Sequence, residues 1–158
     1  MLVALFTGFL LSGCNQNLAD DPEDLSVGIA EAAYERDTET LVRHPAPTLR
    51  DAMLMEPEDG FEDATLTRLT NENLPEGNLQ TSGVQQLSVP LVPDVVSFYD
   101  VTATDPEDRA VTVTVAVVGT EDDDDYEYCA VAVRPQGADP YNDDLFEFVL
   151  GGEDTCGL

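Results

Sequence analysis

The run Ala110-Val111-Thr112-Val113-Thr114-Val115-Ala116-Val117-Val118 carries the strongest structural signal in the chain. Valine occupies every second position from 111 to 117, and this period of two is typical of a β-strand with one apolar face toward a core. The segment 95–103, before it, is also rich in β-branched and aromatic residues. Because the turn-forming run Thr104-Asp105-Pro106-Glu107-Asp108 separates the two segments, we expect an antiparallel hairpin.

Two further strands are predicted in the C-terminal half, at residues 126–133 and 145–150, with an acidic loop at 119–125 before the first of them. In the first of these strands, strict alternation predicts one face made of Cys129, Val131 and Val133 and the other made of Tyr126, Tyr128 and Ala130.

The N-terminal half favours helices. Asp21 and Pro22 suit a helix start, and an apolar stripe with helical spacing follows them, in which Gly28 is a weak point. Asp37 offers a second cap, and residues 48–55 favour a further short helix. Residues 56–83 show no clear pattern apart from a weak strand signal at 65–69, and residues 87–92 suit an edge strand or an irregular connection. Helices followed by strands predict one α+β domain at residues 22–158, with the helices on one face of an antiparallel sheet of about four to five strands.

The charge is extreme and one-sided. The 158 residues carry 33 acidic and 6 basic side chains, all of them Arg, for a formal net charge of −27. Nucleic acid is excluded as a partner, since binding to it depends on neutralising phosphates with Lys and Arg. Contact with anionic lipid headgroups is disfavoured for the same reason. The composition resembles that of proteins from salt-loving archaea, and an acidic actinobacterial exoprotein is the other interpretation.

The N-terminus has the features of an export signal. The apolar run 2–11 is shorter than the roughly 20 residues of a membrane-spanning helix and fits a signal-peptide core. The run ends in Leu11-Ser12-Gly13-Cys14, which resembles the lipobox of prokaryotic lipoproteins. The resemblance implies a signal peptide at residues 1–14, diacylglycerol on Cys14, a tether at 15–21 and anchoring at the outer face of the cytoplasmic membrane. Signal peptides normally carry Lys or Arg before the apolar run, but here Leu2 follows Met1 directly. Either translation begins upstream, or the run is a core element and Cys14 an ordinary thiol.

The other two cysteines, Cys129 and Cys156, form an even pair. In an exported protein they are predicted to form a disulfide, which would stabilise the fold by about 3–4 kcal/mol in the chain-entropy model. Two unpaired buried thiols are the alternative.

Candidate sites for chemistry are few. The acidic run Asp122, Asp123, Asp124 and Asp125 offers oxygen ligands for a weak calcium site, but the EF-hand pattern is absent and a solvated loop explains the run equally. No other metal site is predicted, and no cofactor. His44 is the only histidine. It is either a general base that needs a partner in space, or a surface or helix-capping residue.

The segment Tyr34-Glu35-Arg36-Asp37-Thr38-Glu39-Thr40-Leu41 resembles the junction between the first two helices of NTF2-like (cystatin-like cone) domains. That likeness implies a cone-shaped α+β fold. Since the chain lacks the sequence motifs of hydrolases, metalloproteases and nucleotide-binding proteins, we expect a binding or scaffolding module, with an unidentified envelope protein as a possible partner. The alternatives are a small cone-fold enzyme that uses His44 with an acid and a structural component of the envelope.

Overall fold

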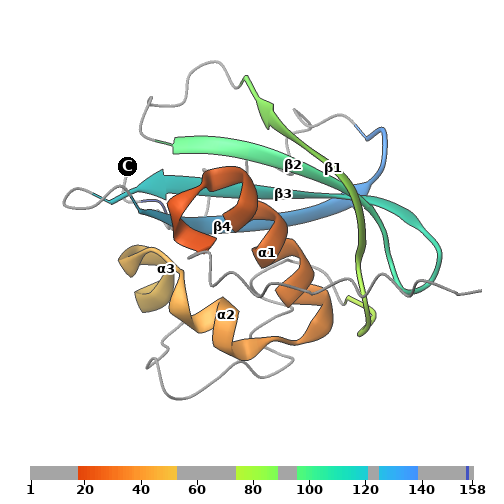
Figure 1. Ribbon diagram of the computed structural model, residues 1–158, viewed down its shortest axis with the longest axis horizontal. Helices are drawn as coiled ribbons and strands as arrows, with labels where there is room; N and C mark the ends of the chain where they lie inside the picture. The colour runs from red at the N-terminus through yellow and green to blue at the C-terminus, as the bar shows by residue number, and fades with distance from the viewer. Residues whose placement is uncertain (1–17, 53–73, 89–95, 121–124, 139–155, 157–158) are drawn as a thin grey trace, which may run out of the picture.

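The computed structural model describes residues 18–52, 74–88, 96–120, 125–138 and 156. The helical half contains a 3-10 turn, η1 (Leu18–Asp20), and three α-helices, α1 (Pro22–Glu35), α2 (Thr38–Arg43) and α3 (Pro47–Ala52). The strands are β1 (Gln80–Leu87), β2 (Val96–Thr104), β3 (Ala110–Gly119) and β4 (Tyr126–Pro135) (Figure 1).

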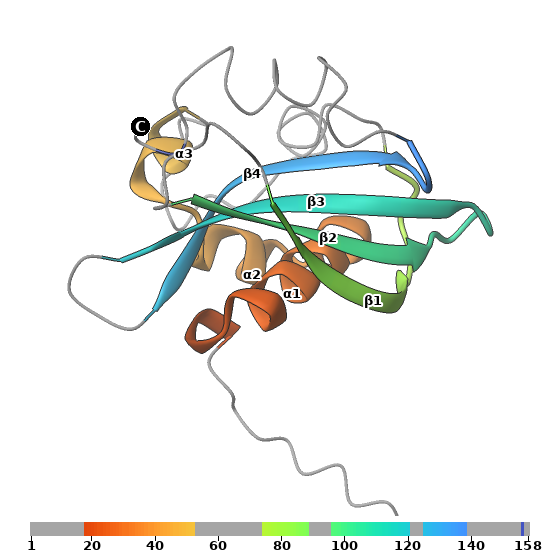
Figure 2. The same ribbon diagram turned by 90° about the horizontal axis from the view of Figure 1, so that it is seen from above.

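The four described strands form one antiparallel sheet in the order β1-β2-β3-β4. Helices α1 and α2 lie on the same face of this sheet, and α3 lies beside β4 (Figure 2). The predicted α+β architecture is therefore confirmed. The predicted strands at 65–69 and 145–150 lie outside the described residues.

The helices begin where the sequence predicts. The Asp21 carboxylate accepts hydrogen bonds from the backbone N–H groups of Glu23 and Asp24, and Pro22 occupies the first position of α1. The first N–H groups of a helix have no partner within it. Asp21 accepts hydrogen bonds from two of them, and Pro22 has no N–H group to satisfy. Arg36, in the left-handed conformation with φ of 58°, ends α1, and Asp37 caps α2 directly afterwards. η1 falls within residues 15–21, the predicted tether, and its Ala19 is buried.

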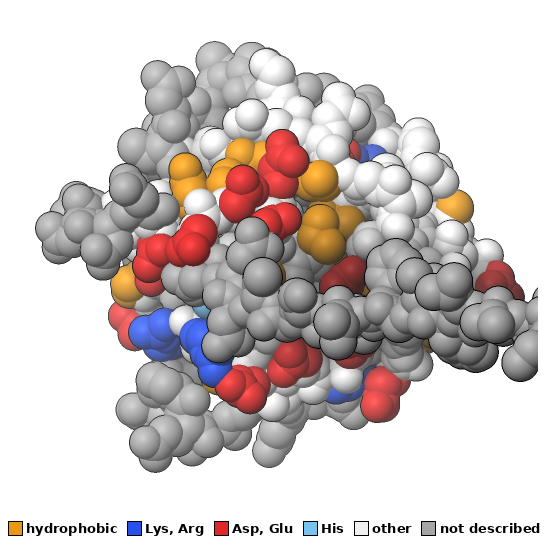
Figure 3. Space-filling model, viewed as in Figure 1, with side chains coloured by type: hydrophobic (Ala, Val, Ile, Leu, Met, Phe, Trp, Pro, Cys, Tyr) orange, Lys and Arg blue, Asp and Glu red, His pale blue; other side chains and the backbone are white. Residues whose placement is uncertain are grey.

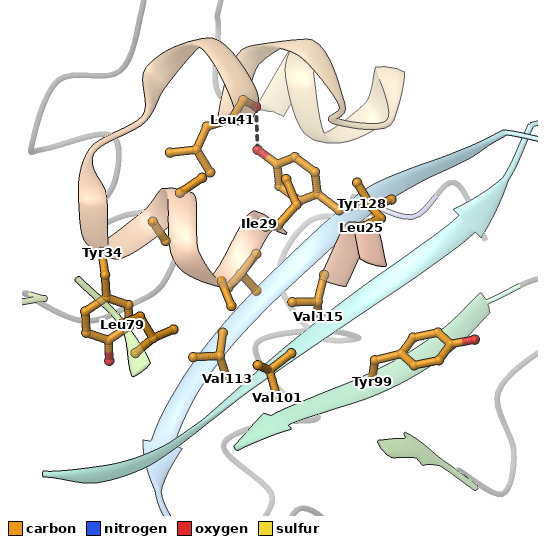
Figure 4. Close-up of a cluster of buried hydrophobic side chains, with 14 of the residues drawn as sticks. Leu25, Ile29, Tyr34, Leu41, Leu79, Tyr99, Val101, Val113, Val115 and Tyr128 are labelled. Carbon is orange, nitrogen blue, oxygen red and sulfur yellow. Dashed lines mark hydrogen bonds between the residues drawn. The ribbon is translucent and has the colours of Figure 1, made fainter. Parts of the chain in front are cut away.

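The main core lies between the helices and the sheet (Figure 4). The alternating valines of β3 all face it, as predicted, and they meet Leu25 and Ile29 of α1. Gly28, which the sequence marks as a weak point of α1, lies under η1. A Cβ there would come within 3.0 Å of the Leu18 side chain. The missing side chain therefore allows η1 to pack closely on the helix.

The predicted alternation in β4 is wrong on one side of a β-bulge. Ala116 of β3 pairs with Ala130, whereas the next residue, Val117, pairs with Tyr128. Cys129 is thus an extra residue, and it faces away from the helices together with Ala130. Tyr128 consequently lies on the helix side with Val131, although strict alternation places them on opposite faces. A bulge shifts the alternation by one residue and leaves no sign in a single strand's sequence.

Strand β1 falls mainly in the stretch where the sequence shows no clear pattern. Six of its eight residues are exposed, so it has no apolar alternation to detect. Val84, which pairs with Val101 of β2, packs against the core from this strand.

Candidate functional site

Several predicted site residues lie outside the described part of the chain: Cys14, Asp122, Asp123 and Asp124. Asp125 is described just before β4, and its backbone carbonyl accepts a hydrogen bond from the Thr120 N–H at 3.0 Å. This bond closes the connection between β3 and β4. Within the described residues, no three His, Cys, Asp or Glu side chains are grouped to hold a metal ion.

The predicted cysteine pair comes together. The Sγ atoms of Cys129 and Cys156 lie 2.17 Å apart, which is disulfide distance, and the Cα atoms are 4.9 Å apart. Cys129 is fully buried in the bulge, on the sheet face away from α1. It packs there with Ala46, Val96, Phe98, Ala116 and Ala130. The bridge therefore joins the end of the chain to this second apolar cluster.

His44 caps the end of α2 and is only 8% exposed. Burial lowers its pKa most, the Arg43 guanidinium lowers it further, and the Asp125 carboxylate opposes both. The main chain around His44 holds the outer edge of β4. The His44 carbonyl accepts the Tyr128 N–H at 3.0 Å, and the Ala46 N–H donates to the Tyr128 carbonyl at 2.8 Å. The segment thus gives Tyr128 a parallel bridge on the side opposite β3.

A polar cluster that the sequence did not reveal crosses three strands on the face away from the helices. Asp100 of β2 accepts a hydrogen bond from the Thr114 hydroxyl of β3 at 2.5 Å, and it forms an ion pair with Arg134 of β4. Arg134 also donates to the Ala138 carbonyl at 2.6 Å. Both charged side chains are 13% exposed. Because these residues are far apart in the sequence, only the strand register brings them together.

A buried carboxylate, Asp105, lies in the turn between β2 and β3. It accepts hydrogen bonds from the backbone N–H groups of Glu107 and Arg109, both at 2.9 Å, and from the Arg109 side chain at 2.7 Å. Burial is the largest single influence on the Asp105 pKa and raises it. The three hydrogen bonds and the Arg109 charge together outweigh burial, so the pKa lies below its ordinary value.

The surface feature that differs most from the rest of the molecule is the outer strand β1. We call Gln80–Leu87 the neutral edge, because residues 77–93 contain no Asp, Glu, Lys or Arg in a chain where 25% of residues are charged. In Figure 3 acidic side chains gather over α1, whereas the surface over β1 is mostly uncharged. The neutral edge therefore adjoins an acidic surface but carries no charge itself.

A side-chain hydrogen bond links the neutral edge to the acidic surface over α1. The Thr81 hydroxyl donates a hydrogen bond to the Glu31 carboxylate of α1 at 3.2 Å. On the inner side, β1 pairs with β2, and a bulge separates Thr81 from Gly83 in that ladder. On the outer side, the backbone of Gln80–Leu87 makes no hydrogen bond to any other described residue.

Comparisons with protein-family models, curated proteins and solved structures find no match for this chain. Among the described helices, none is both long and apolar enough to cross a membrane. We therefore infer function from the residues and their geometry.

Proposed function

We propose that the chain is an exported binding or scaffolding module that a lipid on Cys14 anchors to the outer face of the cytoplasmic membrane. The observation that carries this proposal is the sequence Leu11-Ser12-Gly13-Cys14 directly behind a short apolar run. The disulfide distance between Cys129 and Cys156 supports it, because disulfides persist mainly in oxidising compartments outside the cytosol.

The anchor would hold the domain close to the membrane. The described structure begins at Leu18, four residues after Cys14. An extended chain advances at most about 3.6 Å per residue, so Leu18 lies within roughly 15 Å of the anchored cysteine. The first turn of α1, with Asp21, Glu23 and Asp24, follows closely. Its carboxylates would be repelled by anionic headgroups, and the domain would stand off the surface it is tethered to.

The described charged side chains favour a binding role over catalysis. The half-buried Asp100 pairs with Arg134 across the sheet, and the buried Asp105 pairs with Arg109 to close a turn. By contrast, the neutral edge is exposed and presents a strand backbone. An exposed strand edge is a common docking site for another extended segment. We therefore assign the binding surface to Gln80–Leu87.

The anchor is tested by Cys14→Ser. This variant should move from the membrane fraction to the soluble fraction, and the N-terminal peptide should lose the mass of the diacylglycerol. Asn15→Ser is the matched control, since it changes the adjacent residue and leaves the acceptor cysteine in place. If Cys14→Ser stays in carbonate-washed membranes, the apolar run 2–11 is itself the anchor and the lipoprotein proposal is wrong.

An enzymatic function is the second candidate, because His44 is buried and its lowered pKa keeps it neutral near pH 7, the form that can accept a proton. In that case an acid such as Asp125 would work with His44 in a small cone-fold enzyme. A hydrolase or isomerase activity that is present in the wild type and lost in His44→Gln would favour this candidate over the binding module. A structural role in the envelope is the third candidate, which loss of envelope integrity on deletion of the gene would favour.

A further inference from the structure

The exposed edge of β1 lacks the usual protection of an edge strand. Edge strands are commonly protected by charged side chains, proline, short length or strong bulges, because an open row of N–H and C=O groups pairs readily with another strand. β1 is eight residues long, and Gln80–Leu87 contains no charge and no proline. Its single bulge, between Thr81 and Gly83, leaves the run from Gly83 to Leu87 in regular register with β2.

The opposite edge of the described sheet is protected near the start of β4. The backbone of Tyr128 in β4 is already bonded to His44 and Ala46, and the Cys129 bulge interrupts the strand there. Strand β4 also carries charged residues, Glu127 and Arg134, and ends in Pro135. These features disfavour pairing between β1 of one molecule and β4 of the next, which would grow into a filament.

We propose that two copies of this chain pair through their neutral edges, β1 against β1, in an antiparallel two-fold dimer. The four described strands of each copy would then join in one continuous sheet. A two-fold interface uses the same surface on both subunits and is complete at two copies. Since each copy uses its β1 edge in the pairing, that edge is no longer available and the assembly closes as a dimer.

The charge distribution favours a second copy over a cationic partner. A cationic partner would be drawn to the acidic surface over α1 and away from the uncharged strand. A second neutral edge, in contrast, meets the first without bringing carboxylates of β1 together. The dimer rests on the proposed use of Gln80–Leu87 as the binding surface, and it does not require the lipid on Cys14.

The dimer has a predictable salt dependence. Antiparallel pairing about an axis perpendicular to the sheet places α1 of both copies on the same face. Glu31, which contacts Thr81, would then approach the junction from each side. Repulsion between the two acidic surfaces opposes association, and it weakens as the Debye length falls from about 10 Å at 0.1 M salt to about 3 Å at 1 M. Association should therefore strengthen with salt, and Glu31→Gln should lower the salt that is needed. Glu23→Gln, with the same charge change in the first turn of α1, is the control.

Consecutive proline substitutions test the strand pairing in the full chain, purified in density-matched detergent. Neighbouring residues of an antiparallel strand direct their backbone groups to opposite sides, so one of Gln85 and Gln86 faces β2 and the other faces outward. The outward proline should keep the melting temperature and weaken the dimer at least about tenfold in sedimentation velocity, because each copy loses a donor. The inward proline should lower the melting temperature. A dimer that survives the proline variant with unchanged melting temperature would overturn the proposal.

Cysteine crosslinking gives a second measurement that needs no proline. Single cysteines are placed in turn at Thr81, Ser82, Gln85 and Gln86. The crosslinking yield between copies should have one maximum along β1, near the two-fold axis, because equivalent residues of the two strands are closest there. Gln136→Cys, an exposed position after β4, is the matched control and should not crosslink. A monomer at every salt concentration, or a profile without a maximum on β1, refutes the dimer. Neither result affects the lipid anchor, which fractionation of Cys14→Ser tests separately.

Discussion

The Asp105 carboxylate is fully enclosed in the turn between β2 and β3, and it holds three N–H groups of Glu107 and Arg109. Next to it, Asp108 has a left-handed φ of 59° and its N–H bonds to the Asp105 carbonyl at 3.0 Å. One buried acid therefore fixes both the shape of the turn and the start of β3. The sequence shows the turn through its Asp-Pro pair, but it does not show which acid is buried.

Replacing Asp105 with Asn should destabilise the fold by about 1–3 kcal/mol, because an amide nitrogen would replace the oxygen that accepts from the Arg109 side chain. Denaturant unfolding of Asp105→Asn and wild type at neutral pH measures the difference. Asp108→Asn is the control, since Asn tolerates the left-handed conformation and the residue is exposed.

The pH dependence of that difference follows from the pKa of Asp105. Because the folded pKa is lowered, the stabilisation is complete above the ordinary Asp value and is lost as the pH falls through the folded pKa. The free-energy gap between wild type and Asp105→Asn should therefore be constant near neutrality and shrink in strong acid. A gap that is the same at all pH values would mean that the ionised carboxylate contributes nothing.

At the scale of the elements, the six-residue helix α2 depends on the sheet. Isolated helices of this length are unstable in water, and the last carbonyls of a helix have no partner within it. The fully buried Tyr128 of β4 donates its hydroxyl to the Leu41 carbonyl at 2.7 Å, as the dashed line in Figure 4 shows. The bulge is what turns Tyr128 toward the helices, so an irregularity in β4 supports α2.

Tyr128→Phe should remove this bond and leave the Leu41 carbonyl buried without that donor. We expect a loss of about 1–2 kcal/mol in unfolding free energy and faster amide exchange in α2 than in α1. Tyr126→Phe, the same change at a half-buried position two residues earlier, should have little effect. Equal effects of the two variants would contradict a specific role for the Tyr128 hydroxyl.

The elements also show how far sequence reasoning reaches. The hairpin of β2 and β3 was predicted because alternating valines and a turn motif are local signals. The bulge in β4 and the Asp100–Arg134 pair depend on which strand lies beside which, and no local pattern encodes that. The uncharged run at 77–93 was not singled out from the sequence, and its role as an edge strand follows only from the strand order. Its exposed Gln, Thr and Ser residues hide the strand from any pattern based on burial.

At the scale of the whole molecule, the net charge of −27 dominates. Among the described residues, Arg43 and Arg109 form ion pairs with acids close in the sequence, and Arg134 pairs with Asp100 across the sheet. Folding brings the remaining carboxylates closer together than they lie in the expanded chain, so their repulsion opposes folding. Exposed ion pairs each contribute at most about 1 kcal/mol and do not offset that repulsion.

Thermal stability should therefore rise steeply from low salt into molar KCl or NaCl, because screening removes repulsion that the folded state feels more than the unfolded chain. Melting temperatures by circular dichroism across that range measure the effect. Calcium separates general screening from binding at a specific site. General screening predicts a gradual response to CaCl₂, whereas a site at Asp122–Asp125 predicts saturation at low concentration that the triple change of Asp122, Asp123 and Asp124 to Asn abolishes. A melting temperature that stays flat from low to molar salt would show that the carboxylates lie too far apart to destabilise the fold. It would also remove the physical basis for interpreting this composition as an adaptation to high salt.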